Sequence, residues 1–205
     1  MQFKIGSEVD SEHCNALMHE YYRCEDAFNT FCYFGEMMVK NGRTNEVSYR
    51  AYNAYGSFIH SLYEFLLGCF ARDARNTNIT NKKGEDRTLI IEHYITRHAQ
   101  RVMDQYRDAI KERRAPDWVN DISYYDVSVP KEFAKDFREY RNKICGHVAY
   151  ERSSKLNLSQ FYQKYHKFLY YMYRDSMHYY GRKGGDFPDL KDITDFSIMI
   201  EREKT

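Results

Sequence analysis

The sequence has little proline, no long apolar run and no closely spaced pair of cysteines. Only three prolines occur among its 205 residues, at positions 116, 130 and 188. The long proline-free stretches leave room for long helices, because proline inside a helix removes a hydrogen bond and clashes with the preceding turn. No stretch approaches the ~20 apolar residues of a transmembrane helix, and the opening MQFKIGSEVD lacks the apolar centre of a signal peptide. We therefore expect a cytoplasmic protein that does not span a membrane.

The cysteines favour free thiols over a disulfide framework or a zinc site. Five are present, at positions 14, 24, 32, 69 and 145, so their number is odd and no pair has the CxxC spacing. Zinc ribbons and redox motifs use that spacing, and disulfide frameworks use an even number of cysteines. No P-loop, dinucleotide-binding glycine pattern or nucleophile elbow occurs either. We expect a reducing compartment, no metal ion and no cofactor.

Charge is balanced, whereas aromatic residues are abundant. The chain has 31 Lys and Arg against 30 Asp and Glu, a net charge of +1, so a nucleic-acid site would have to be a local patch. Aromatic residues make up 17% of the chain and include 20 tyrosines. Because tyrosine buries apolar area and keeps a hydroxyl for a partner, we expect a core with many polar tips. The same side chains would also suit stacked bases or an interface.

Apolar residues recur at three- and four-residue steps, the period of a helix, over five segments. These are residues 11–40, 45–71, 86–114, a segment from about 130 with Pro130 in its first turn, and 158–180. The second has the widest apolar stripe and is expected to be central. Residues 72–87 are polar without a period and predict a loop, either solvated or in contact with a nucleic-acid backbone. The prediction is an all-α, four- to five-helix up-and-down bundle, one domain over residues 1–185, with an acidic, loosely attached tail over 186–205.

One segment combines groups that could cleave RNA. It reads FREYRNKICGH over residues 137–147 and contains Arg141 and His147. Arginine offers a permanently charged fork for phosphate oxygens, and histidine exchanges a proton near neutral pH. Together they suit cleavage of a phosphodiester by the RNA's own 2′-hydroxyl, which needs no metal. A straight helix would place them roughly 120° apart, so they converge only if the helix ends or bends near Gly146, or across a dimer axis.

This segment resembles the motif of the HEPN superfamily (higher eukaryotes and prokaryotes nucleotide-binding), in which four to six residues separate Arg from His. Here five residues separate Arg141 from His147, and Asn142 stands in the polar position after the arginine. The stretch SFIHSLYEFLLGCF is similar to a helix of that family, with Glu64 where an acidic residue often lies. The resemblance implies a bundle of HEPN type, a homodimer formed through the motif-bearing face, and a metal-independent endoribonuclease that leaves a cyclic phosphate. It also implies a toxin or antiphage defence effector, in some cases beside a nucleotidyltransferase antitoxin.

The resemblance also implies roles for individual residues. Arg141 would hold the scissile phosphate, His147 would act as general acid or base, and Asn142 would orient the phosphate or the arginine. Glu64 would support this site from the second helical segment. Three neighbouring side chains that are not motif positions are expected to contact RNA as well: Arg138, Tyr140 and Lys143.

A structural role for the same residues remains open. Arg141 could form a salt bridge to Glu64 or Glu139, and His147 could cap the end of its helix. The protein would then be a non-catalytic module that binds RNA or a protein partner, or a structural component of a larger complex. His60 and Glu64 lie four residues apart, as metal ligands might, but no third ligand has a matching spacing, so a helix-surface pair is favoured.

Overall fold

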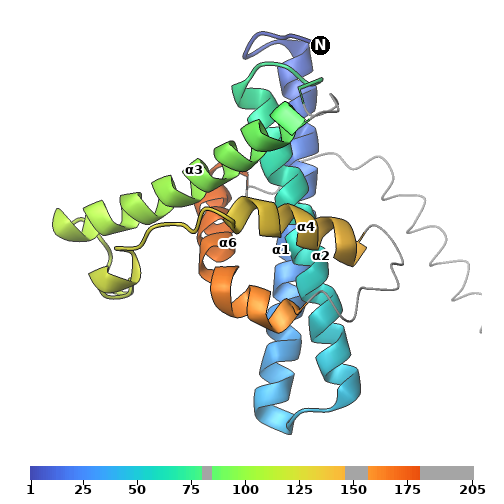
Figure 1. Ribbon diagram of the computed structural model, residues 1–205, viewed down its shortest axis with the longest axis vertical. Helices are drawn as coiled ribbons and strands as arrows, with labels where there is room; N and C mark the ends of the chain where they lie inside the picture. The colour runs from blue at the N-terminus through green and yellow to red at the C-terminus, as the bar shows by residue number, and fades with distance from the viewer. Residues whose placement is uncertain (80–84, 146–156, 181–205) are drawn as a thin grey trace, which may run out of the picture.

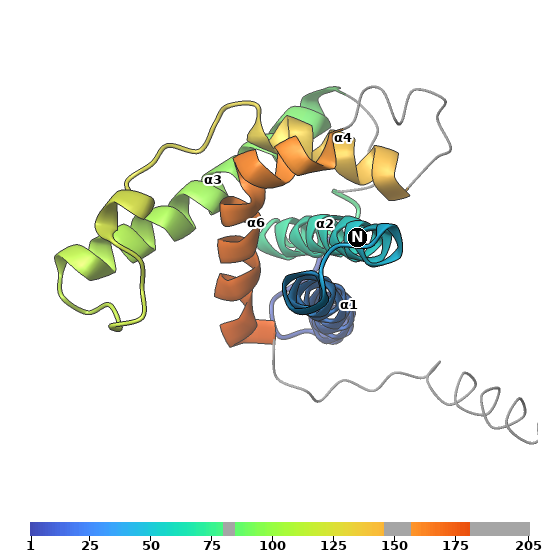
Figure 2. The same ribbon diagram turned by 90° about the horizontal axis from the view of Figure 1, so that it is seen from below.

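The computed structural model describes residues 1–79, 85–145 and 157–180, which form a bundle of α-helices (Figures 1 and 2). The helices are α1 (Glu8–Asn41), α2 (Asn45–Asp73), α3 (Glu85–Lys111), α4 (Phe133–Cys145) and α6 (Leu158–Tyr180), with a short 3₁₀ turn, η1 (Ile122–Tyr124). Gln2 and Asn76 form an isolated bridge, and the described residues contain no strand. The prediction of an all-α helical bundle is confirmed.

α1 and α2 form a long antiparallel hairpin against which the other helices pack (Figure 1). α3 and α4 run across this hairpin, and α6 changes direction after its first turns (Figures 1 and 2). The first part of α6 lies beside α4, and the remainder runs back toward α1 (Figure 2). α2 therefore contacts α1, α3, α4 and α6, as its wide apolar stripe predicts.

The core is aromatic, and several of its buried tyrosine hydroxyls have hydrogen-bond partners. The hydroxyl of buried Tyr55 lies 3.0 Å from Nδ1 of His166. The hydroxyl of buried Tyr165 donates to Asp136 at 2.5 Å. A buried hydroxyl without a partner would cost about 1–3 kcal/mol, so these bonds let tyrosine serve where phenylalanine would otherwise be expected.

An ion pair joins the start of α1 to the end of α2. Ser7 caps α1 and accepts the backbone N–H of Asp10. The buried carboxylate of Asp10 accepts two hydrogen bonds from Arg72, at 2.9 and 3.2 Å, and one from the Gly6 N–H at 2.8 Å. Arg72, followed by the Gly6 N–H, lowers the pKa of Asp10 to about 2. This contact extends α2 through Asp73, although the sequence predicts that Arg72 and Asp73 lie in a loop.

The polar loop predicted over residues 72–87 is shorter than expected. α2 includes its first two residues and α3 its last three. The backbone N–H of Phe3 donates to the carbonyl of Arg75 at 3.0 Å, which ties the turn after α2 to the N-terminal segment. This long-range contact has no signature in the local sequence. Residues 80–84 lie outside the described part of the chain.

Two other helix boundaries differ from the prediction for local reasons. α3 ends at Lys111 rather than at residue 114, because Arg113 has a φ of +56°, in the left-handed region that ends helices. α4 begins at Phe133, whose N–H donates to the carbonyl of Pro130 at 3.0 Å. Pro130 therefore lies in a turn that precedes the helix, and its predicted place in the first helical turn is wrong.

Gly68 allows α1 and α2 to pack closely. A Cβ atom at position 68 would lie 2.5 Å from Cδ2 of Leu17, a buried residue of α1. Nε2 of His13, also on α1, lies 2.9 Å from the carbonyl oxygen of Gly68. The side chain of Leu17 thus occupies the space that any larger residue at position 68 would need.

Several sequence predictions fall on other parts of the chain. The boundary between a domain over residues 1–185 and a tail over 186–205 stays a prediction, because both sides of it lie outside the described residues. None of the helices in the described residues is both long and apolar enough to cross a membrane. Cys14, Cys24, Cys32 and Cys69 are free thiols, among which Cys24 is buried and Cys32 is exposed.

The stability of the fold is expected to depend on pH through His166. Burial lowers the pKa of this imidazole to about 4, whereas an unfolded chain has a value near 6.5. Between these values the unfolded state binds the additional proton, so the free energy of unfolding decreases as the pH falls from about 6.5 to about 4. Between pH 7 and pH 5, the free energy of unfolding should therefore decrease by about 1–2 kcal/mol less in His166→Gln than in the wild type. Urea denaturation at the two pH values measures this difference.

The exposed His93 on α3 provides the control for this measurement. His93→Gln should follow the wild-type dependence of stability on pH. Equal pH dependence in His166→Gln and the wild type would contradict a neutral, buried His166.

Candidate functional site

Arg141 lies near the end of α4 and is held by residues of α2 and α4. Its guanidinium forms an ion pair with Glu64 of α2, and both side chains are 31% exposed. A second N–H donates to Oδ1 of the neighbouring Asn142 at 2.8 Å. The guanidinium carbon also lies 5.7 Å from the ring centre of Tyr63, within the range of a cation–π contact. These contacts fix the guanidinium in one orientation at the surface of the bundle.

The contacts of Arg141 leave part of its hydrogen-bonding capacity unused. A guanidinium has five N–H donors, and the bonds to Glu64 and Asn142 use two of them. The Nε atom of Arg141 is buried and has no partner among the described residues. Because this Nε is shielded from solvent, an anionic oxygen would bond instead to N–H groups on the exposed part of the guanidinium, whose side chain is 31% exposed.

The other cations of the motif segment also face carboxylates. Nε of Arg138 donates to Glu92 of α3 at 2.9 Å, and the Glu92 side chain is only 17% exposed. Nζ of Lys143 lies 4.0 Å from Glu139, one turn earlier on α4, in an exposed pair. Each carboxylate lowers the positive potential available to a nucleic-acid backbone. RNA contacts by Arg138 and Lys143 remain a prediction, and Arg138 would have to exchange its partner.

Tyr140 links the end of α4 to the start of α6. Its hydroxyl donates to the carbonyl of Asn157 at 2.9 Å and accepts the Asn157 N–H at 3.0 Å. Its ring stacks on Phe161 with 4.2 Å between ring centres. Tyr140 thus uses both its hydroxyl and one ring face within the protein, which leaves the predicted RNA contact to the remaining exposed edge.

The structure places only part of the predicted catalytic set. Arg141, Asn142 and Glu64 are brought together, although Arg141 and Glu64 are 77 residues apart in sequence. α4 is described through Cys145, and His147 lies outside the described residues. The convergence of His147 with Arg141 therefore remains a prediction.

The structure offers no metal site in the residues it describes. No group of three or more His, Cys, Asp or Glu side chains there lies close enough to hold a metal ion. His60, one turn before Glu64 on α2, has a buried Nδ1 without a hydrogen-bond partner in the described part of the chain. The carboxylate of Glu64 is engaged by Arg141 rather than by this imidazole.

Sequence reasoning missed a cavity away from the motif. It lies at the turn between α1 and α2, where Arg43 meets Tyr52, Tyr55 and Tyr162. Tyr52 and Tyr55 belong to the apolar stripe predicted for residues 45–71, and Arg43 is a single charged residue in a turn. No local signal could have found this cavity, because its residues come from α1, α2, α6 and the turn.

The ion pair between Glu64 and Arg141 is expected to stabilise the fold as well as orient the arginine. Glu64→Gln leaves a partly buried guanidinium without its countercharge and should lower the free energy of unfolding by about 1–3 kcal/mol. A double-mutant cycle with Arg141→Met, followed by urea denaturation, should give a coupling energy of about 1–2 kcal/mol.

The exposed pair of Lys143 and Glu139 is the matched control on the same helix. Its coupling energy should be no more than about 0.5 kcal/mol, as for other exposed pairs four residues apart. Similar coupling in the two cycles would show that the contact of Arg141 with Glu64 does not hold the arginine in place.

The chain matches no known protein-family model, no curated protein and no solved structure. Its resemblance to the HEPN superfamily therefore rests on the motif residues.

Proposed function

We propose that the protein is a HEPN-like, metal-independent endoribonuclease in which Arg141 and His147 act on the scissile phosphodiester. Arg141 would bind the phosphate and stabilise its developing negative charge. His147 would transfer a proton to or from the 2′-hydroxyl or the leaving oxygen. Asn142 would orient the guanidinium through the bond that it already accepts. The products would carry a 2′,3′-cyclic phosphate.

The observation that carries this proposal is the supported but incompletely bonded guanidinium of Arg141. Glu64 and Asn142 fix its orientation with two of its five N–H donors, and the side chain is 31% exposed, so a phosphate can approach the exposed part of the guanidinium. A catalytic group benefits from such support, because a pre-oriented charge needs no reorganisation during the reaction. His147 follows Arg141 by six positions in the sequence, two residues beyond the end of α4.

A non-catalytic helical module is the alternative, and the same ion pair supports it. A bond between Arg141 and Glu64 is what a purely structural role for the arginine requires. The pairing of Arg138 with Glu92 also fits a helix whose cations serve packing. The two functions differ in what His147 does, so variants of this residue separate them.

The proposed assembly and biological role follow from the same resemblance. Two copies joined through the motif-bearing face would line one cleft with two copies of Arg141 and His147. The protein would act as a toxin or antiphage effector that cleaves cellular RNA. Its partner would be an antitoxin such as a nucleotidyltransferase. Size-exclusion chromatography with light scattering would test the dimer directly.

The cleavage assay uses a labelled RNA of mixed sequence in buffer with EDTA. We expect the wild type to cut this RNA, and His147→Ala to cut it about 10²–10⁴-fold more slowly, as for loss of a proton-transfer group. Arg141→Lys keeps a positive charge opposite Glu64 but loses the planar fork that matches a phosphate. It should also lose cleavage while its thermal unfolding stays close to that of the wild type.

Lys135→Ala is the matched control, because it removes an exposed cation from the same helix. It should cut at the wild-type rate. If the wild type and the His147 and Arg141 variants all cut equally, or none cuts RNA, the motif is not catalytic. RNA binding without cleavage would then favour the helical module.

A further inference from the structure

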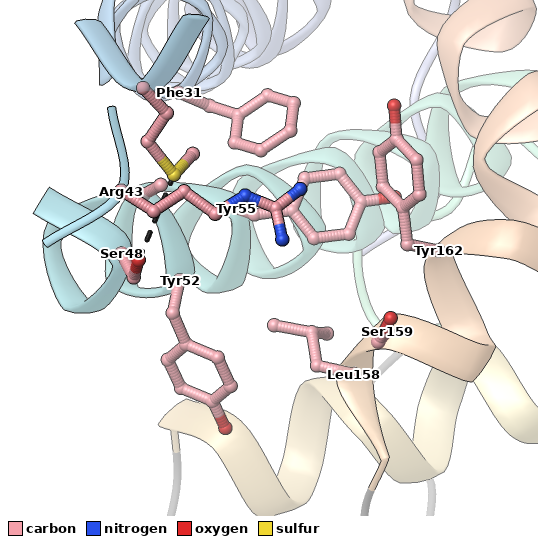
Figure 3. Close-up of a pocket in the computed structure, with 10 residues that line it drawn as sticks. Phe31, Arg43, Ser48, Tyr52, Tyr55, Leu158, Ser159 and Tyr162 are labelled. Carbon is pink, nitrogen blue, oxygen red and sulfur yellow. Dashed lines mark hydrogen bonds between the residues drawn. The ribbon is translucent and has the colours of Figure 1, made fainter. Parts of the chain in front are cut away.

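A cavity of about 440 Å³ lies between the α1–α2 turn and the first turn of α6 (Figure 3). Its volume falls within the ~300–1,000 Å³ typical of small-molecule sites. In Figure 3, Arg43 extends into the cavity, and the rings of Phe31, Tyr52, Tyr55 and Tyr162 surround it. The cavity thus combines aromatic walls with one cation.

The aromatic walls support one another and leave ring surface exposed. Phe31 and Tyr55 have ring centres 4.9 Å apart, and Tyr55 meets Tyr162 edge-on at 5.2 Å. One face of Tyr162 stacks on His166 at 4.3 Å, which fixes the plane of its ring. Tyr162 is nevertheless 38% exposed. A fixed, partly exposed ring at a cavity is a stacking platform for a planar ligand.

Arg43 gives the cavity an unneutralised positive charge. It follows Gly42, whose φ of +83° turns the chain between α1 and α2, and it precedes Thr44, the N-cap of α2. Within the described part of the chain, the guanidinium of Arg43 has no hydrogen bond and no ion pair. None of the residues that line the cavity carries a carboxylate. This contrasts with Arg141, whose charge is opposed by Glu64.

The start of α6 adds to the cavity's preference for an anion. The first turn of α2, beside Arg43, contains Glu46, whereas the first two residues of α6, Leu158 and Ser159, line the cavity. The positive end of a helix dipole favours negative charge. The first turn of α6 contains no acidic residue, and its Gln160 N–H is capped by the neutral amide of Asn157 at 3.0 Å. The arrangement therefore favours a ligand that is both planar and anionic.

We infer that this cavity binds a phosphorylated nucleoside, with the base against Tyr162 and the phosphate on Arg43. Aromatic rings stack on any base, and the planar fork of arginine fits phosphate oxygens. The hydroxyl groups of Ser48 and Ser159, which line the same cavity, supply further hydrogen bonds. The nucleotide comes either from the free pool or from an RNA strand. This binding site stands whether or not Arg141 takes part in RNA cleavage.

The test is calorimetric titration of the full chain in EDTA with adenosine 5′-monophosphate, adenosine and inorganic phosphate. We expect adenosine monophosphate to bind with a Kd below about 1 mM, more tightly than either fragment. Arg43→Gln should weaken monophosphate binding about 10-fold or more and leave adenosine binding unchanged. Tyr162→Leu should weaken the binding of both ligands by roughly 5- to 150-fold, as expected for loss of one stacked base.

Arg50→Gln is the matched control, because Arg50 is a nearby arginine paired with Glu46 at 2.7 Å and does not line the cavity. It should bind the monophosphate as the wild type does, and so should Arg141→Lys, which separates this site from the one proposed for cleavage. Tighter binding of a 5′-phosphorylated oligoadenylate than of the monophosphate would assign the site to an RNA strand, and equal or weaker binding to a free nucleotide. Binding of the monophosphate no tighter than that of inorganic phosphate, or unchanged binding in both Arg43→Gln and Tyr162→Leu, would overturn the inference.

Discussion

The burial of α2 is the constraint on which the rest of the structure depends. α1, α3, α4 and α6 all pack on it, and residues such as Phe58 and Leu62 are completely buried. A polar side chain on such a helix must find a partner on a neighbour, because a partly buried charge without one is costly. Glu64 finds its partner in Arg141 of α4. The position of α4 on the bundle and the orientation of the candidate catalytic arginine are therefore two results of one requirement.

The helices could be predicted from sequence because their apolar periods are long and proline interrupts them rarely. The ends of the helices were harder to predict from sequence. Arg72 belongs to α2 because it bonds to Asp10, which lies 62 residues earlier in the sequence. The sequence near Arg72 contains no pattern that predicts this partner. α3 ends early because of a left-handed residue, Arg113, that is neither glycine nor asparagine. Helix interiors depend on local composition, whereas these ends depend on tertiary contacts and single backbone conformations.

The candidate sites divide in the same way. The contact between Arg141 and Glu64 could be predicted as one of two options, because the motif singled out Arg141 and the resemblance of the second helical segment singled out Glu64. The role of this contact could not be predicted, because a catalytic arginine that is held in place and a purely structural arginine make the same bond. The cavity around Arg43 had no sequence signature. Its rings lie on α1, α2 and α6, and only the turn at Gly42 and the bend of α6 bring them together (Figures 1 and 3).

Gly68 gives the spacing of the α1–α2 hairpin a functional meaning. It stands one helical turn after Glu64, at a place where the side chain of Leu17 leaves no room for a Cβ atom. A methyl group there would act as a wedge between the two helices, and close-packed interiors transmit such displacements rather than absorb them. The carboxylate that holds Arg141 would be among the first groups to move. The absence of a side chain at position 68 therefore makes the geometry of the arginine site sensitive to the distance between α1 and α2.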